Sequence, residues 1–192
     1  MRTLVVNHLS LDGVFQGPGD ADEDTREDFE QGGWASVASD QSLGEVMAQH
    51  MGENFEWLFG RRTYDDVLGH WNEVRGPFKE GLDDRTKYVV STHTDAELPW
   101  PNSVLVTGDV PDQVAALRER PGGKLVIMGS GELVRTLLPN DLIDEMLLFI
   151  HPVLLGSGHR LFEPREVVTW WNLTDATSTS SGVLVAAYEP AR

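Results

Sequence analysis

Two short segments of the sequence carry groups suited to binding phosphate. The first, Gly60-Arg61-Arg62-Thr63, follows the apolar run Trp57–Phe59 and begins a helical pattern. Two guanidinium groups supply charge and forked donors, and a helix that begins there presents free N–H groups and the positive end of its dipole. These residues predict a phosphate or pyrophosphate site; the alternative is a surface pair that balances an acidic loop.

The second segment is a glycine turn, Gly129-Ser130-Gly131-Glu132-Leu133, which follows the apolar run Lys124–Met128. Glycines at a strand-to-helix turn let backbone approach a ligand closely, as in dinucleotide sites. The string is not a G-x-G-x-x-G motif, because Val134 stands where the third glycine would be. A purely structural turn is therefore the alternative interpretation.

Together the two segments favour one ligand. Each follows a predicted strand and precedes a predicted helix, and the carboxyl ends of parallel strands meet at one edge of a sheet. We therefore expect the arginine pair and the glycine turn to lie side by side. The simplest ligand is a nucleotide whose phosphates span both turns.

Other kinds of chemistry are excluded by what the sequence lacks. It has no cysteine, and its six histidines are scattered. Disulfides, thiolate nucleophiles and cysteine-containing zinc sites are therefore impossible. No G-x-S-x-G, H-E-x-x-H or Walker A pattern occurs. We expect no metal site and neither hydrolytic nor phosphoryl-transfer chemistry.

The charge of the chain limits its partners. Among 192 residues, 31 are Asp or Glu and 15 are Lys or Arg, so the formal net charge is −16. Binding to nucleic acid or to anionic lipid needs clustered basic residues, so we expect neither partner. No signal-peptide pattern or apolar run long enough to cross a bilayer is found. The expectation is a cytoplasmic protein that acts on a small molecule.

The pattern of apolar runs predicts an α/β fold. Most runs are rich in Val, Ile and Leu without alternation, which is typical of strands buried on both faces. The predicted strands are Leu4–Leu11, Trp57–Phe59, Lys87–Ser91, Ser103–Thr107, Lys124–Met128, Met146–Leu155, Trp170–Asp175 and Val183–Tyr188. We expect a single domain over residues 1–192, with three layers: a mostly parallel central sheet flanked by helices, with antiparallel strands at its C-terminal end.

Helix boundaries are predicted from capping patterns. Ser42 with Glu45 forms a capping box, and Thr63 with Asp66 forms a similar one. Pro111 suits the first turn of a helix, and Gly131 begins another that Pro139 ends. Residues 17–33 contain seven acidic residues, and we interpret them as a solvated insertion or, alternatively, as a substrate lid.

Five motifs, in order along the chain, resemble those of the dihydrofolate-reductase-like superfamily. The sequence is most similar to stand-alone relatives of the reductase domain of the riboflavin-biosynthesis deaminase–reductase. The motifs are Ser10-Leu11-Asp12-Gly13, Gly60-Arg61-Arg62-Thr63-Tyr64, Lys87–Ser91, Gly129–Leu133, and Leu142–Glu145 leading to Pro152–Phe162.

The resemblance implies NADPH as hydride donor and assigns residues to it. Arg61 would contact the ribose 2′-phosphate, with Gly60, Arg62 and Thr63 at the phosphates. Ser91 and Thr92 would border the adenosine. Gly129, Ser130, Gly131, Glu132 and Leu133 would cradle the pyrophosphate, with a cis peptide between Gly129 and Ser130. Asn7, Asp12 and Gly13 would lie near the nicotinamide and the substrate.

The substrate side is assigned by the same resemblance. Folate reductases carry a carboxylate on the helix after the first long loop, and Asp40 and Glu45 are the acids available there. We take Asp12 and Asp40 as candidate catalytic residues, although a turn and a pre-helix role explain them as well. His159 and Arg160 are candidate contacts to a phosphorylated sugar chain.

The expected activity is reduction of a small heterocyclic or ribosylamino-pyrimidine substrate, as in 5-amino-6-(5-phosphoribosylamino)uracil reductase. One alternative is a true dihydrofolate reductase, and another is a nucleotide-binding protein without turnover. Met146–Leu155 and Trp170-Trp171 could join two copies into a homodimer, although burial within one subunit explains them as well.

Overall fold

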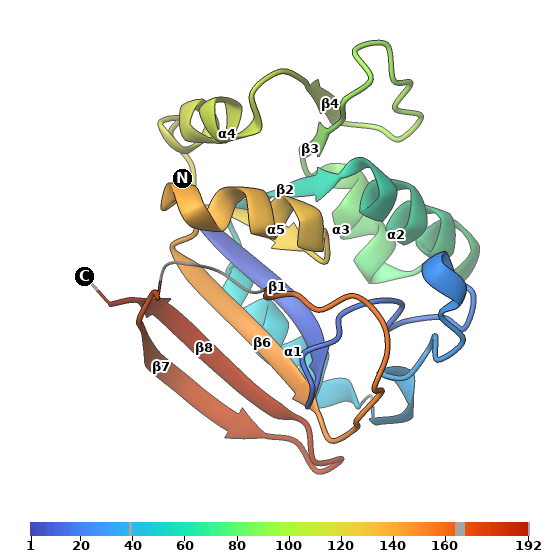
Figure 1. The fold of residues 1–192 in the computed structure, drawn as a ribbon. Helices are drawn as coiled ribbons and strands as arrows, with labels where there is room; N and C mark the ends of the chain where they lie inside the picture. Colours follow the sequence, from blue (N-terminus) through green and yellow to red (C-terminus); the bar gives the residue numbers. More distant parts are fainter. Residues whose placement is uncertain (39, 164–167, 192) are drawn as a thin grey trace. The chain divides into compact units, whose positions relative to one another are not determined.

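A computed structural model describes residues 1–38, 40–163 and 168–191 (Figure 1). Its strands are β1 (Arg2–Ser10), β2 (Phe55–Gly60), β3 (Lys87–Val90), β4 (Ser103–Val106), β5 (Lys124–Met128), β6 (Glu145–His151), β7 (Trp171–Ser178) and β8 (Leu184–Pro190). Its α-helices are α1 (Gln41–Met51), α2 (Arg61–Val74), α3 (Pro77–Asp84), α4 (Val110–Arg118) and α5 (Gly131–Leu137). Short 3₁₀ helices cover Arg26–Asp28, Ser36–Ala38 and Leu138–Asn140.

The chain divides into two compact units. The first comprises Met1–Leu4 and Met51–Ile143, and the second comprises Val5–His50 and Asp144–Arg192. The first unit contains strands in the order β4-β3-β2-β5, and the second contains the order β1-β6-β8-β7. The prediction of one domain over residues 1–192 remains a prediction.

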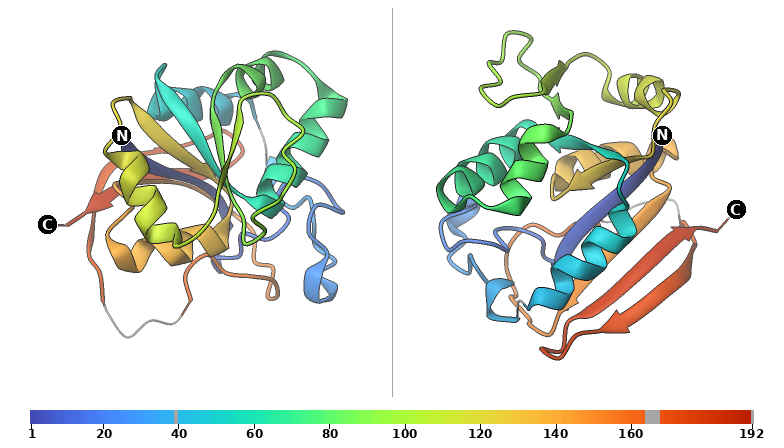
Figure 2. Two further views of the ribbon diagram at one scale, coloured as in Figure 1. Left: turned by 90° about the horizontal axis from the view of Figure 1, so that it is seen from above. Right: turned by 180° about the vertical axis from the view of Figure 1, so that it is seen from behind.

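The first unit has the predicted parallel sheet. Strand β2 pairs in parallel with both β3 and β5, and β3 pairs in parallel with β4. Trp57, Leu58 and Phe59 are all at most 1% exposed, so consecutive side chains are buried on both faces of β2. Helix α2 packs with α3, and α4 packs with α5. The left view of Figure 2 shows the strands running between these two helix pairs.

The second unit has the predicted antiparallel strands. Strand β8 pairs in antiparallel fashion with both β6 and β7. The right view of Figure 2 shows α1 lying across the face of β1 and β6. Strand β6 is largely buried and ends at His151, before Pro152, so the expected strand to Leu155 is too long. The run from Met146 is therefore part of the core, whereas Trp170 is 77% exposed.

Two predicted helix caps are wrong. Asp40, not Ser42, caps α1, because its carboxylate accepts the backbone N–H of Ser42 at 2.9 Å. Helix α2 begins at Arg61, with Gly60 in extended conformation as its cap and no side-chain cap. Thr63 therefore lies in the first turn, where its hydroxyl is available to another segment.

Helix α3 was not predicted from the sequence. Pro77 occupies its first turn, and Gly76 before it has a φ of 107°. The fully buried ammonium of Lys87 donates to the carbonyls of Leu82 and Arg85 and so satisfies the C-terminal end of this helix. No helix in the described ranges has both the length and the apolar character that crossing a bilayer requires.

Gly123 keeps the start of β5 close to the chain before β2, where Lys124 N donates to Asn54 O at 3.1 Å. A Cβ on Gly123 would lie 1.8 Å from that same carbonyl oxygen. We expect Gly123→Ala to lower the free energy of unfolding by about 2 kcal/mol or more, because backbone must move.

Gly69→Ala in α2 is the matched control, since a methyl group added at Gly69 would meet nothing within 4 Å. It should raise the free energy of unfolding by about 0.5–1 kcal/mol through helix propensity. Urea unfolding measures both variants, and equal stability of the two would contradict this account of Gly123.

Candidate functional site

The two predicted phosphate-binding turns are joined by two hydrogen bonds in the first unit. Gly60 N donates to Ser130 Oγ at 2.9 Å, and Ser130 N donates to Thr63 Oγ1 at 3.1 Å. Strands β2 and β5 are neighbours, with Leu58 opposite Ile127, so both turns leave the same edge of the sheet. This confirms that the arginine segment and the glycine turn lie side by side. We call this pair of hydrogen bonds the Ser130 clasp.

The glycine turn has left-handed backbone at two successive residues. Gly129 has a φ of 60°, and Ser130 has φ and ψ of 52° and 51°. A Cβ on Gly129 would also lie 3.3 Å from the methyl group of Thr63. The peptide bond between Gly129 and Ser130 is trans, so the expected cis bond is wrong. Two successive left-handed residues make the sharp turn instead.

The two arginines have different surroundings. Nε of Arg61 donates to Asp65 at 2.8 Å, and its Nη1 donates to the carbonyl of Glu97 at 2.9 Å. The bond to Asp65 is the main reason that the pKa of Arg61 is raised. Arg62 is half exposed and lies 3.6 Å from a carboxylate oxygen of Glu132, which forms an ion pair between the two turns. Two of the five N–H donors of Arg61 are thus engaged by protein groups.

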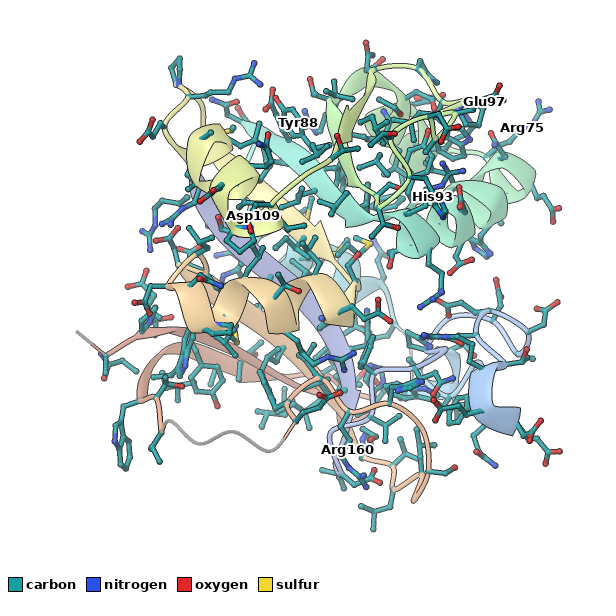
Figure 3. All side chains as sticks on the ribbon, turned by 45° about the horizontal axis from the view of Figure 1, so that its top comes forward. Arg75, Tyr88, His93, Glu97, Asp109 and Arg160 are labelled. Carbon is teal, nitrogen blue, oxygen red and sulfur yellow. The ribbon has the colours of Figure 1, made fainter. Side chains whose placement is uncertain are left out.

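The chain after β3 supplies the third expected part of the site. Ser91 is buried, and its hydroxyl accepts the backbone N–H of His93 at 3.0 Å, whereas Thr92 is exposed. Figure 3 labels His93 and Glu97 on this loop. Through Glu97 O the loop reaches Arg61, so it is attached to the start of α2. The three segments that were expected to contact the adenosine and phosphate parts of the cofactor therefore belong to one unit.

In the second unit, Asp12 anchors the turn after β6. Its carboxylate accepts hydrogen bonds from Ser10 Oγ at 2.7 Å, Leu155 N at 3.2 Å and Gly156 N at 2.9 Å. The bond from Ser10 is the largest of the effects that lower the pKa of Asp12 to about 2. Asp12 is therefore ionised at neutral pH and is suited to accept hydrogen bonds, not to donate a proton.

Residues next to Asp12 also form hydrogen bonds within this turn. Gly13 has a φ of 80°, and its carbonyl accepts from Leu161 N. Nε of Arg160 donates to the carbonyl of Asp12 at 2.9 Å, so Arg160 holds this turn. Asn7 is buried within β1. The roles predicted for these residues at the nicotinamide and the substrate remain predictions.

Asp40 and His159 also have structural partners. The carboxylate of Asp40 caps α1 and accepts from the hydroxyls of Ser180 and Ser181. It also accepts from the hydroxyl of Ser42, and this bond is the main cause of its lowered pKa. His159 N donates to the side chain of Gln16, and Nε2 of His159 lies 3.6 Å from Glu27. Helix capping therefore accounts for Asp40, and its catalytic role remains a prediction.

The acidic segment 17–33 forms a closed loop. Gly33 N donates to Gly17 O at 2.8 Å, and Phe29 inserts among buried residues. The amide of Gln16 donates to the carbonyls of Asp24 and Arg26. These contacts hold the loop at its base and at its middle.

A pair of histidines in the second unit has no counterpart among the sequence motifs. Nδ1 of His8 lies 2.8 Å from Nε2 of His151, with the His8 ring stacked on Phe149 and the Trp34 edge against His151. Burial, and then the neighbouring His151, lower the pKa of His8 to about 4, and burial also lowers the pKa of His151. Both rings are therefore neutral at pH 7. Neither residue belongs to a recognisable pattern, since only pairing of β1 with β6 brings them together.

Comparisons with known structures agree with this architecture. A candidate riboflavin biosynthesis protein from Shewanella sp. PV-4 superimposes with a TM-score of 0.71 at 23% identity, covering all of both chains. A pyrimidine reductase-like protein from Corynebacterium diphtheriae gives 0.65 at 14% identity, covering all of this chain and 92% of that one. Dihydrofolate reductase from Enterococcus faecalis, complexed with NADP(H) and RAB-propyl, gives 0.64 at 12% identity, covering all of this chain and 97% of that one. The fold is dihydrofolate reductase-like.

Sequence comparison identifies the family. The RibD C-terminal domain family matches residues 3–185, so the chain belongs to that family. Among curated proteins, it is 29% identical to Bacillus subtilis YyaP over 137 residues, which are 68% of this chain and 71% of YyaP. It is 30% identical to YwjB of the same organism over 105 residues, which are 55% of this chain and 56% of YwjB.

The histidine pair predicts how stability depends on pH. The unfolded His8 has a pKa of 6.5, whereas the folded one has a pKa of about 4. Between these values the unfolded chain binds a proton that the folded chain does not. The free energy of unfolding should therefore fall as the pH falls from 7 toward 4, by up to about 3 kcal/mol from this residue.

Urea unfolding of the wild type and of His8→Phe at pH 7, 5.5 and 4.5 measures this effect. The variant keeps every carboxylate, so the difference between the two pH profiles isolates the histidine. We expect a shallower profile for the variant. Parallel profiles would show that the pKa of His8 is not lowered in the folded protein.

Proposed function

We propose that this protein is an NADPH-dependent reductase of the riboflavin-biosynthesis type. Its substrate would be a small heterocycle or ribosylamino-pyrimidine related to 5-amino-6-(5-phosphoribosylamino)uracil. The observation that carries this proposal is the Ser130 clasp, which brings a doubly cationic helix start and a glycine turn together. Membership of the RibD C-terminal domain family and the pyrimidine reductase-like neighbour support the same activity.

The residues of the first unit fit a phosphorylated dinucleotide. Gly129 leaves no side chain between the turn and Thr63, where a Cβ would be crowded. Arg62 is the more exposed arginine and is suited to the pyrophosphate, while Arg61 retains unused donors for the 2′-phosphate. In this proposal Ser91 and Thr92 border the adenosine, and Gly131 to Leu133 follow the pyrophosphate.

The chemistry divides between cofactor and protein. When bound, NADPH would supply the hydride. The protein's own groups would bind and orient the reactants and exclude water from them. Asn7, Asp12 and Gly13 are proposed to contact the nicotinamide or the substrate, with Asp12 acting as an ionised acceptor because its pKa is about 2.

His159 and Arg160 are proposed to contact the phosphorylated sugar chain of the substrate. A homodimer is proposed to form through the region of the exposed Trp170.

Two measurements in sequence test the activity. NADPH binding followed by fluorescence separates a cofactor-binding enzyme from a scaffold. Oxidation of NADPH with either dihydrofolate or the pyrimidine ribosylamine then identifies the reaction. We expect turnover of the ribosylamine, because the Asp40 carboxylate is occupied as a helix cap. Turnover of dihydrofolate alone would favour a true dihydrofolate reductase.

Arg61→Ala tests the preference for NADPH. The 2′-phosphate is the group that distinguishes NADPH from NADH, so loss of the guanidinium should weaken NADPH binding about tenfold or more. The affinity for NADH should change by no more than about twofold. Asp65→Asn is the matched control, because it removes the carboxylate that holds Nε of Arg61 but keeps the cation. If Arg61→Ala weakened the binding of NADPH and of NADH by the same factor, Arg61 would not be the residue that contacts the 2′-phosphate.

A further inference from the structure

The histidine pair lies where two strands of the second unit end side by side. His151 is the last residue of β6, and His8 stands two residues before the end of β1. Beyond them Leu11 N donates to Val153 O at 2.8 Å, and Asp12 holds Leu155 and Gly156. Ligands of open α/β sheets bind outside the carboxyl ends of strands. The pair is therefore at an edge suited to a substrate.

The surroundings of the pair assign its protons. In two neutral rings, one nitrogen of the 2.8 Å contact donates and the other accepts. Nδ1 of His151 is buried and has no hydrogen-bond partner among the residues that the structure describes. Buried N–H groups without an acceptor are rare, so we assign this nitrogen a lone pair. His151 then carries its proton on Nε2 and donates it to Nδ1 of His8, whose own proton is on Nε2.

Packing fixes both rings in this arrangement. The His8 ring stacks on Phe149 with centroids 4.9 Å apart, and the edge of Trp34 meets His151 at 5.3 Å. His151 is 1% exposed, whereas His8 is half-buried. His8 is therefore the member of the pair that can reach a bound molecule, and His151 is the member that orients it.

We propose that His8 donates a neutral Nε2–H hydrogen bond to the substrate heteroatom that gains negative charge during reduction, with His151 as the positioning residue that fixes its tautomer. The proposal rests on the reductase function proposed above. When the carbon of a C=N or C=O group accepts a hydride from a nicotinamide cofactor, the π bond breaks and its electron pair moves to N or O. A preorganised N–H donor stabilises this charge, and a proton from water completes the reduction.

The neutrality of the ring suits this role. Burial lowers the pKa of His8 to about 4, so at neutral pH the ring is an uncharged donor and not an imidazolium ion. Neutral imidazole acts as an electrophile in other enzymes whose environment lowers the histidine pKa. A hydrogen bond from the neighbouring residue decides which ring nitrogen carries the proton.

The tautomers can be measured without cofactor or substrate. Long-range ¹⁵N–¹H correlation spectra of the labelled protein at pH 7 should show both rings protonated on Nε2. In His151→Phe, which removes the donor to Nδ1, His8 should show a mixture of tautomers. A wild-type His8 protonated on Nδ1 would overturn the proposal.

The catalytic effect is tested with two substitutions at one position. Phe at position 8 keeps the stacked ring but removes the donor, whereas His8→Gln keeps a neutral N–H donor. With NADPH and the pyrimidine ribosylamine, we expect His8→Phe to lower kcat about 100-fold and His8→Gln to lower it by about tenfold or less. NADPH affinity should stay within about twofold of the wild type in both variants.

The possible outcomes separate the two proposals. Unchanged kcat in His8→Phe, or an equal loss in His8→Gln, would overturn the role of His8. Failure of the wild type to bind NADPH would instead refute the proposed cofactor. In that case the tautomer spectra still decide the proton arrangement, because they need no ligand.

Discussion

The Ser130 clasp is the interaction on which the candidate cofactor site depends. Its two hydrogen bonds use one residue, Ser130, to satisfy the start of α2 and to occupy the hydroxyl of Thr63. Buried polar groups that lose such partners cost about 1–3 kcal/mol, so the two turns hold each other in place. The left-handed backbone at Gly129 and Ser130 is maintained by this closure. A cationic helix start and a glycine turn thereby become one surface suited to phosphate.

The arginine pair of this surface stands out in an acidic chain. With a net charge of −16, an anion is repelled from most of the protein. Arg61 and Arg62 concentrate positive charge at one helix start, yet each has a carboxylate nearby, Asp65 and Glu132 respectively. These ion pairs are partly exposed to solvent and contribute little to stability. Their effect is to hold the two guanidinium groups beside the turns.

The second unit uses hydrogen bonds for a different purpose. Asp12 is bonded on both carboxylate oxygens, and Asp40 caps a helix, so both acids suggested by the resemblance are engaged by protein donors. The described strand ends also carry His8 and His151, whose rings are neutral at pH 7 because burial lowers the pKa of each. A reductase built in this way would rely on neutral donors and on water for its proton.

Local patterns in the sequence predicted the strands, the parallel pairing in the first unit and the two turns suited to phosphate, because strands buried on both faces and glycine turns are recognisable within a few residues. The order of the strands was not predicted. The caps predicted at Ser42 and Thr63 were wrong because both helices begin earlier in the sequence. Asp40 caps α1 and Gly60 caps α2 instead. The clasp and the His8–His151 pair join residues 70 and 143 positions apart. Only the pairing of strands brings such residues together, so the tertiary structure alone decided them.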